Sequence, residues 1–224
     1  MKRSLGWLLA VGFGVCLLGM GCKKGDQVRS DASAPAPAAA PAGWSQVYSA
    51  DFKSVQKVPA EWAAVSGEAR VANGALEVKG DGGDGQLVLK NPKCPGNVRV
   101  EVVASLVGAN DEVCDLSPFI NSDESGYEAG YLMQFGGGGN AENRLRRAGE
   151  VVDSTVNTKM MVKAGKKYLL VAENDGGKVR LTADGQELLS YKDASPLKGA
   201  GNGNIGFYTW GCTLRIDKIA VFTK

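Results

Sequence analysis

The sequence predicts an all-β domain, a two-sheet antiparallel sandwich of the jelly-roll kind, and three observations support that prediction. Short segments of alternating apolar and polar residues recur from Trp44 to the C-terminus, and this period of two is typical of half-buried strands. Turn dipeptides such as Asn73-Gly74 and Asp184-Gly185 separate the segments. Beyond Trp44, no helical period persists for more than two turns. Many short strands joined by turns favour a sandwich or jelly roll.

Residues 1–21 have the features of a signal peptide that directs export. The basic residues Lys2 and Arg3 come first, and an apolar segment then runs from Leu5 to Leu18. That segment is short and rich in glycine for a membrane span, whereas its length suits the hydrophobic region of a signal peptide. We therefore expect this segment to be removed, and an uncleaved anchor is the alternative.

The residues Gly19-Met20-Gly21-Cys22 resemble the lipobox of bacterial lipoproteins, in which the cysteine is lipidated and becomes the new N-terminus. Lys23 follows the cysteine, and the resemblance to Gram-negative lipoproteins implies sorting to the outer membrane. The expected location is the bacterial cell envelope, with the protein anchored in the outer membrane through Cys22 and facing the periplasm or the cell surface. An ordinary signal peptide with a chance cysteine is the alternative.

Residues 22–43 are predicted to form the lipidated cysteine and a tether rich in alanine and proline. The sequence of residues 31–43, DASAPAPAAAPAG, has no hydrophobic periodicity and so cannot build a packed core. Regularly spaced prolines favour an extended polyproline conformation, in which twenty residues span roughly 60 Å. Such a tether would hold a domain clear of a membrane surface.

The predicted sandwich domain covers residues 44–224, and its strands follow one another along the chain. The longest alternating segment is Asn97–Val107, in which Val98, Val100 and Val102 share one face. The glycine-rich segment 80–85 is expected to be a loop. The other predicted strands, apart from a central hairpin, are Gln46–Phe52, Ala75–Lys79, Gln86–Lys90, Asp115–Asn121, Val151–Asn157, Lys167–Asn174, Lys178–Ala183, Glu187–Tyr191, Asn204–Trp210 and Thr213–Phe222.

The central hairpin is predicted for residues 126–149. Its loop is Gly136–Gly139, and a return strand follows from Asn143 to Arg147. Alternation places one apolar set on the core side, namely Tyr127, Ala129, Tyr131, Met133 and Phe135. The opposite side would carry Glu128, Gln134, Arg144 and Arg146. This polar row has the composition of a binding surface, and a plain solvated sheet face is the alternative.

The composition excludes several classes of function. The 224 residues include no histidine, which excludes Ser-His-Asp and Cys-His catalysis and histidine-ligated metal sites. The formal charge is +2, and the positive balance lies in the N-terminal segment, so we expect no nucleic-acid partner. Asp81 and Asp84 lie in a glycine-rich loop, but two carboxylates are few for calcium. We expect neither a metal nor a cofactor.

Three cysteines, Cys94, Cys114 and Cys212, lie in the predicted domain. An exported chain meets an oxidising compartment, so we expect a disulfide. Three cysteines allow three pairings and leave one thiol over. Cys114 and Cys212 both adjoin strands near the proposed binding face, which favours their pairing.

The last strands carry the sequences GNIGFY at 203–208 and LRIDKIAV at 214–221. These segments resemble the end of concanavalin A-like lectin and glucanase domains, including the laminin-G-like ones. Asp51-Phe52, the turn Asn73-Gly74-Ala75-Leu76, and Asn121-Ser122 leading to Gly126-Tyr127-Glu128 are similar to a bacterial family named 3-keto-disaccharide hydrolase. The resemblance spans roughly residues 44–224, and it implies a jelly-roll fold and action on sugars.

A glycosidase of this kind needs two carboxylates about 5 to 10 Å apart. Glucanases of this fold carry them in a Glu-x-Asp-x-x-Glu motif on one strand, and that motif is absent from this sequence. Glu128 is the best single candidate, with Asp115 or Glu142 as its partner. Trp210, on the penultimate strand, is a candidate surface for stacking against a sugar ring.

The expected function is carbohydrate binding, of a glycan or a cell-wall polysaccharide, on the concave face of the sandwich. The expected ligand-binding residues are Glu128, Gln134, Arg144, Arg146 and Trp210. The alternatives are a glycoside hydrolase of the 3-keto-disaccharide hydrolase type and a structural envelope protein whose concave face binds another protein. Catalysis has less support, because the sequence has neither a paired-carboxylate motif nor a histidine.

Overall fold

The structure, a computed structural model, describes residues 40–80, 82–108 and 113–224 of the chain. The predictions for the signal peptide, for lipidation of Cys22 and for most of the tether lie outside the described residues, as does Asp81. Within the described ranges, no helix combines the length and the apolar character that crossing a membrane requires.

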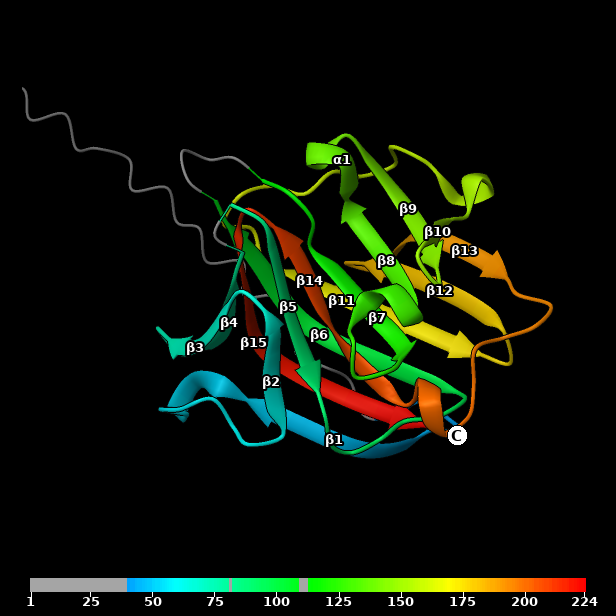
Figure 1. Cartoon of the computed structure of the whole chain (residues 1–224), viewed down its shortest axis with the longest axis horizontal. Helices are drawn as coiled ribbons and strands as arrows, with labels where there is room; N and C mark the ends of the chain where they lie inside the picture. The colour runs from blue at the N-terminus through cyan, green and yellow to red at the C-terminus, as the bar shows by residue number, and fades with distance from the viewer. Residues whose placement is uncertain (1–39, 81, 109–112) are drawn as a thin grey trace, which may run out of the picture. The chain divides into compact units, whose positions relative to one another are not determined.

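Two antiparallel sheets form the described domain, and the predicted two-sheet sandwich is confirmed (Figure 1). The first sheet has eight strands, of which β1 (Ser45–Asp51) pairs with β15 beside the main path. Along that path the order is β13 (Gln186–Lys192), β12 (Lys178–Ala183), β11 (Tyr168–Asp175), β6 (Val98–Val107), β15 (Thr213–Thr223), β4 (Ala75–Lys79) and β3 (Glu68–Ala72).

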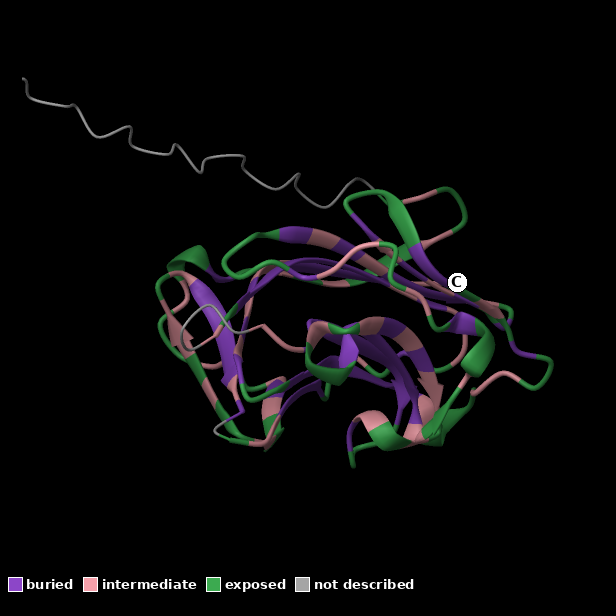
Figure 2. Ribbon diagram, turned by 90° about the horizontal axis from the view of Figure 1, so that it is seen from above, coloured by how far each residue is buried: buried purple, intermediate pink, exposed green. Residues whose placement is uncertain are grey.

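The second sheet has seven strands and carries the segments predicted to bind a ligand. Its order is β10 (Glu150–Val151), β9 (Glu142–Arg147), β8 (Tyr131–Gly136), β7 (Ser117–Ser122), β14 (Asn204–Trp210), β5 (Asp84–Leu89) and β2 (Trp62–Ser66). Seen from above in Figure 2, buried residues gather along the strands of both layers, and exposed residues lie mainly on turns and edges.

Short helical turns connect the strands. They are η1 (Phe52–Ser54), η3 (Tyr127–Ala129), α1 (Gly137–Asn140), η4 (Asp153–Thr155) and η5 (Ala200–Asn202). The glycine run of the central hairpin lies in α1, where Gly138 and Gly139 have left-handed φ angles of 62° and 72°. Residues with a Cβ rarely adopt these angles, so the glycine run makes this tight connection possible.

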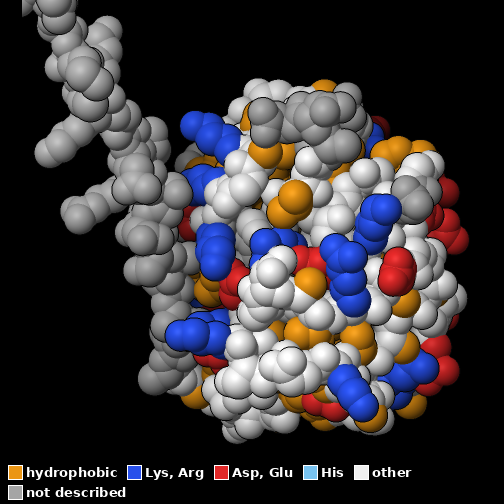
Figure 3. Space-filling model, turned by 90° about the vertical axis from the view of Figure 1, so that its left-hand side faces the viewer, with side chains coloured by type: hydrophobic (Ala, Val, Ile, Leu, Met, Phe, Trp, Pro, Cys, Tyr) orange, Lys and Arg blue, Asp and Glu red, His pale blue; other side chains and the backbone are white. Residues whose placement is uncertain are grey.

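The surface around β3 and β4 carries mixed charges. Figure 3 shows this side of the domain, where Lys and Arg side chains are interspersed with Asp and Glu. Arg70 on β3 contacts Glu77 on β4 at 2.9 Å. The basic side chains of this side are therefore partly neutralised by neighbouring carboxylates.

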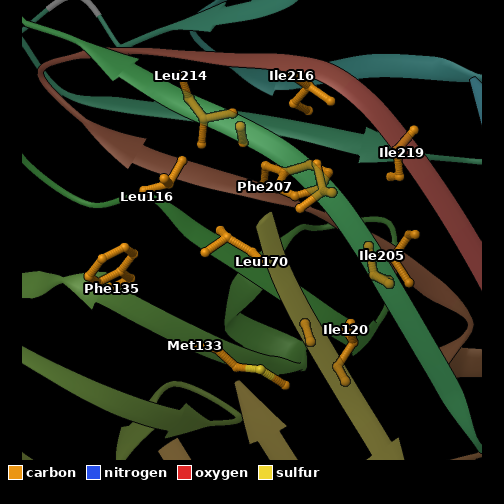
Figure 4. Close-up of a cluster of buried hydrophobic side chains, with 14 of the residues drawn as sticks. Leu116, Ile120, Met133, Phe135, Leu170, Ile205, Phe207, Leu214, Ile216 and Ile219 are labelled. Atoms are coloured by element: carbon orange, nitrogen blue, oxygen red, sulfur yellow. The ribbon is translucent and has the colours of Figure 1, made fainter. Parts of the chain in front are cut away.

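The hydrophobic core lies between the sheets. Val98, Val100 and Val102 of β6 point into it, as their alternation predicts. The rings of Phe135 on β8 and Tyr168 on β11 meet edge to face with centroids 5.1 Å apart. Each fully buried large apolar side chain contributes about 1.5–3 kcal/mol. Figure 4 shows members from both sheets: Leu116, Ile120, Met133, Phe135, Leu170, Ile205, Phe207, Leu214, Ile216 and Ile219.

The predicted strand before the glycine loop begins later than expected. β8 starts at Tyr131, and Tyr127–Ala129 forms the turn η3. Gly126 has a φ of 102°, and the N–H of Gly130 donates to the carbonyl of Tyr127 at 3.1 Å. These glycines close a turn, so the prediction that Tyr127 faces the core beside Tyr131 is wrong. The placement of Glu128 on a strand is wrong for the same reason.

The strand predicted for Val151–Asn157 is also mostly wrong. β10 ends at Val151, and η4 follows it. The hydroxyl of Thr155 accepts a hydrogen bond from the N–H of Leu145 at 2.9 Å, so the chain folds back against β9. The edge strands β2 and β3 have no counterpart among the predicted strands, because their short alanine-rich sequences show little contrast between apolar and polar positions.

The predicted disulfide between Cys114 and Cys212 is wrong. Among the cysteines of the described chain, Cys94, Cys114 and Cys212, no disulfide is formed. The β7–β14 register ends at Ser117 and Tyr208, so both cysteines lie beyond the paired strands. The ladder therefore does not impose the short Cα separation that a disulfide requires.

Candidate functional site

The outer face of the seven-stranded sheet, the face turned away from the core, collects polar and aromatic side chains in cross-strand rows. In one row Arg144 on β9 lies opposite Gln134 on β8. Further across the same sheet, Tyr208 on β14 lies opposite Gln86 on β5. Residues opposite one another in an antiparallel ladder point to the same side, so these strands present one continuous surface.

A chain of hydrogen bonds runs along this row from β9 toward β7. Arg144 Nε donates to Gln134 Oε1 at 2.6 Å, and Arg144 Nη1 contacts Glu142 Oε1 at 2.7 Å. The amide nitrogen of Gln134 donates to the carboxylate of Asp115, just before β7. Both ends of the buried Gln134 amide are therefore fixed. Carboxylate, amide and guanidinium groups together offer donors and acceptors to hydroxyl groups.

Asp115 has an unusual protonation equilibrium. Only 3% of the residue is exposed, and this burial raises the pKa of its carboxyl to about 6. The hydrogen bond from Gln134 and the charge of Arg144 limit the rise, while the carboxylate of Asp84 adds to it. The group can therefore exchange a proton near neutral pH, a property that is frequent in functional sites.

Asp84 lies on the other side of β14 from Asp115. Its carboxylate accepts a hydrogen bond from the hydroxyl of Tyr208. Burial first and then this bond raise the pKa of Tyr208, so the hydroxyl stays protonated. Trp210 lies opposite Asp84 in the ladder and is 52% exposed. A large aromatic surface is thus accessible at the end of β14.

An apolar row lies beside the polar one. Val88, Phe119, Leu132 and Tyr208 form a buried cluster that is separate from the core. Phe119 lies opposite Gly206 on β14, where an added Cβ would come within 2.3 Å of the Phe119 ring. The absence of a side chain at Gly206 therefore gives the ring its space on the outer face.

Tyr127 stands beside this cluster on η3. Its ring meets the ring of Tyr208 edge to face, with centroids 4.6 Å apart. Its N–H donates to Gln86 Oε1 at 3.2 Å. The two tyrosines form an aromatic wall next to the polar row, and we call this pair the tyrosine wall.

Several hydrogen bonds hold η3 in place. The hydroxyl of Ser122 donates to the carbonyl of Gly126. The side-chain amide of Asn202 donates to the carbonyls of Asn121 and Ala129 at 3.2 and 3.4 Å. The turn that carries Tyr127 is therefore attached to β7 and to η5.

Four of the five predicted ligand-binding residues lie on one face of the sheet, and the fifth, Glu128, lies on a turn. These four, Gln134, Arg144, Arg146 and Trp210, lie on the outer face of the seven-stranded sheet. The hydrogen bond between Gln134 and Arg144 joins two of them directly. Glu128 is exposed on η3, and the carboxylate in contact with Arg144 is Glu142. Tyr131 and Phe207 are fully buried in the core, as predicted.

Sequence reasoning did not bring Asp84, Gln86 and Tyr208 together. They belong to β5 and β14, which are distant in the sequence and adjacent in the sheet. The alternation of β14 does place Tyr208 and Trp210 on one face, but the partner strand is set by the fold. Asp84, considered with Asp81 for calcium, contacts Tyr208. Across the described ranges, no group of three or more Cys, Asp or Glu side chains is arranged to hold a metal ion.

Comparisons with known proteins identify the fold. No protein-family model and no curated protein matches the chain in sequence. The carbohydrate recognition domain of Emp47p matches it with a TM-score of 0.57 and 15% identity, over 79% of this chain and 95% of that chain. The carbohydrate-binding module CBM66 from Bacillus subtilis matches with a TM-score of 0.55 and 17% identity, over 70% and 94%.

A glycoside hydrolase has the same architecture. SCLam, a non-specific endo-β-1,3(4)-glucanase from family GH16, matches with a TM-score of 0.57 and 12% identity, over 84% of this chain and 94% of that chain. The chain therefore has the concanavalin A-like fold that these lectin and glucanase domains share, and the predicted fold is confirmed. At these identities the likeness shows the fold alone. The narrower similarity to the 3-keto-disaccharide hydrolase family stays a prediction.

Proposed function

We propose that the outer face of the seven-stranded sheet binds carbohydrate, either a glycan or a cell-wall polysaccharide. The observation that carries this proposal is the position of the tyrosine wall next to the hydrogen-bonded chain of Asp115, Gln134 and Arg144. The structural neighbours include a carbohydrate recognition domain, a carbohydrate-binding module and a glucanase, which supports the same class of ligand.

The chemistry of this face suits a sugar. A sugar ring has apolar C–H faces and hydroxyl groups at its edge, so it matches an aromatic surface beside a few fixed polar groups. The polar groups here are already held by one another, through Arg144 to Gln134 and Gln134 to Asp115. Binding would therefore require little additional ordering of side chains.

A broad glycan array probed with the full-length protein in detergent tests the proposal. We expect Gln134→Ala and Tyr127→Ala to weaken the detected binding by about tenfold, because a lost hydrogen bond or aromatic contact costs about 1–1.5 kcal/mol. Gln186→Ala is the matched control, since Gln186 is exposed on β13 of the other sheet. The proposal fails if no glycan binds, or if the site variants bind as tightly as the control.

A second candidate function, glycoside hydrolysis, is favoured by the positions of Asp84 and Asp115. They flank β14, so two strand spacings, roughly 10 Å, separate their backbones. Glycosidases place their two carboxyl groups about 5 to 10 Å apart. Asp115, with a pKa near 6, would protonate the leaving oxygen, and Asp84 would take a proton from the attacking water. A hydrolase of the 3-keto-disaccharide type is a narrower form of this candidate.

The release of new reducing ends separates hydrolysis from binding alone. A hydrolase would release them from a bound glycan, and Asp115→Asn would abolish the release by more than about a hundredfold while the glycan still binds. Binding without any release would leave carbohydrate recognition as the function.

We also propose that the protein is an outer-membrane lipoprotein anchored through Cys22. The lipobox-like sequence before Cys22 and the alanine- and proline-rich tether of residues 22–43 support this location. Labelling cells with a fatty-acid analogue should mark the wild type, and Cys22→Ser should lose both the label and the membrane association. A Cys22→Ser variant that stays acylated would contradict the proposal.

A further inference from the structure

The three arginines of β9 differ in their partners. Arg144 and Arg147 each contact a carboxylate, at 2.7 and 2.6 Å respectively. Arg146 donates through Nε to the carbonyl of Gly149 at 2.9 Å. Within residues 40–80, 82–108 and 113–224, no carboxylate lies within ion-pair distance of Arg146. The two terminal nitrogens of its guanidinium group are therefore available to a ligand.

Arg146 lies at the end of the apolar row, close to the tyrosine wall. It is opposite Leu132 on β8, and Leu132 is opposite Phe119 on β7. Burial raises the pKa of Tyr127, the carboxylates of Asp84 and Glu128 raise it further, and the charge of Arg146 lowers it. The turn after Arg146 also lies against η3, since an added Cβ on Gly149 would be 3.9 Å from the carbonyl of Glu128. Arg146 and Tyr127 thus lie on neighbouring segments at the edge of the buried apolar row.

We propose that Arg146 binds the carboxylate of an acidic sugar, a uronic acid residue whose ring rests against Tyr127. This inference rests on the proposed carbohydrate-binding function and adds the charge and the orientation of the ligand. A guanidinium group binds a carboxylate through two parallel hydrogen bonds. A neutral sugar has no group that makes this contact.

The acidic residues of the face determine the orientation of such a ligand. Asp84 and Asp115 lie toward β14 and β7 and would repel a carboxylate, while their oxygens accept hydrogen bonds from sugar hydroxyls. The carboxylate is therefore directed to β9, and the hydroxyls to the polar row. Glu128 is exposed beside Tyr127, and solvent screens its repulsion of the ligand.

Isothermal titration of the full-length protein in detergent tests the inference. The uronate-containing oligosaccharide that binds best on the array is compared with its methyl ester, which keeps the backbone and removes the charge. We expect the acid to bind about tenfold more tightly or better. Arg146→Gln should abolish this preference and leave the affinity for the methyl ester unchanged. Arg70→Gln, a change to an exposed arginine of the other sheet, should change neither affinity.

Further measurements separate the possible failures. Glu128→Gln should leave the binding of the acid unchanged or strengthen it, and a tenfold loss would make Glu128 the ligand-binding residue instead. A sulfated counterpart that binds more tightly than the uronate would assign the site to sulfated sugars and overturn the carboxylate assignment. Binding of neutral glycans alone, with loss in Tyr127→Ala, overturns this inference and keeps the proposed function. If no glycan binds, both fail.

Discussion

Each sheet has a buried carboxylate on its outer side, and these two carboxylates are held in different ways. On the eight-stranded sheet, Glu77 is 3% exposed and lies between two cations, Arg70 at 2.9 Å and Arg215 at 3.1 Å. On the seven-stranded sheet, the carboxylate of Asp115 accepts a hydrogen bond from the neutral amide of Gln134. Glu77 is therefore neutralised by arginines, whereas Asp115 is held by a neutral amide.

The ion pairs of the eight-stranded sheet extend along neighbouring strands. Glu173 on β11 contacts Arg99 on β6 at 2.7 Å and Arg180 on β12. Arg99 also contacts Glu101 at 2.7 Å. Charges paired in this way have little capacity left for a ligand. A row of charged residues on a sheet can therefore be assigned to a binding surface only after the partners of each group have been identified.

The largest effect is expected from Gly206→Ala, which would disrupt the apolar row of the seven-stranded sheet. An added Cβ would lie 2.2 Å from the carbonyl of Leu87 and 2.3 Å from the Phe119 ring. Overpacking of this kind costs about 3 kcal/mol, which lowers Tm by roughly 6–12 °C in a chain of this size. Gly201→Ala is the control, since no atom lies within 4 Å of its added Cβ. Equal Tm values for the two variants would show that the apolar row tolerates a side chain at position 206.

A somewhat smaller effect is expected in the pH dependence of stability. Asp115 and an acid that is paired with an arginine should contribute to it with opposite signs. Burial raises the pKa of Asp115 from 3.8 to about 6, so the folded state binds its proton more tightly than the unfolded state. Its contribution to stability is fully present below about pH 4 and is lost as the pH rises through about 6. The shift corresponds to roughly 2–3 kcal/mol.

Urea unfolding at pH 4 and pH 7 measures this contribution. The wild type should gain about 2–3 kcal/mol relative to Asp115→Asn on going from pH 7 to pH 4. Asp193→Asn provides the opposite case. Burial alone would raise the pKa of Asp193, but hydrogen bonds from Tyr131 and Arg147 hold it below its ordinary value. The stability from Asp193 is therefore present above about pH 4 and lost as the pH falls. If the stability difference from the wild type changed with pH in the same direction for both variants, the opposite pKa shifts of Asp115 and Asp193 would be refuted.

The smallest effect is expected from Glu173→Gln in the ion-pair network of the other sheet. The change leaves Arg99 and Arg180 without their shared anion. Both arginine side chains are partly exposed, so water replaces some of the lost interaction. We expect a loss of about 1–2 kcal/mol in the free energy of unfolding and no change in glycan binding. Glu68→Gln, an exposed change on β3, is the control. A loss of glycan binding in Glu173→Gln would mean that the two faces are coupled.

The sequence predicted those parts of the fold that follow from local alternation. The segments that form β6, β8, β9 and β14 alternate clearly, so the core positions of Val100, Tyr131 and Phe207 could be predicted. The alternation of Tyr127 with Tyr131 was misleading, because Tyr127 belongs to a short turn that is flanked by Gly126 and Gly130. The strand begins only after this turn, at Tyr131. Local periodicity does not show where a glycine ends a strand.

The candidate site could be predicted only in part. Gln134 and Arg144 are joined by one hairpin, so the predicted loop position was enough to pair them. Asp84 lies on β5, Tyr208 on β14 and Asp115 just before β7, and these strands meet through the order β7–β14–β5. That order is a property of the whole sheet. The sequence pattern does not distinguish the ion pairs of one sheet from the hydrogen-bonded polar row of the other.

The attachment of η3 has a consequence for the kinetics of binding. Gln86, Ser122 and Asn202 hold the turn that carries Tyr127 before a ligand arrives. Association would then require no slow loop closure, and its rate would be set by diffusion and orientation. Differences in affinity among ligands and variants would appear mainly in how long the complex lasts, that is, in the dissociation rate. If the proposed function is right, this face would exchange weakly bound sugars quickly and would retain only those that engage all of its groups.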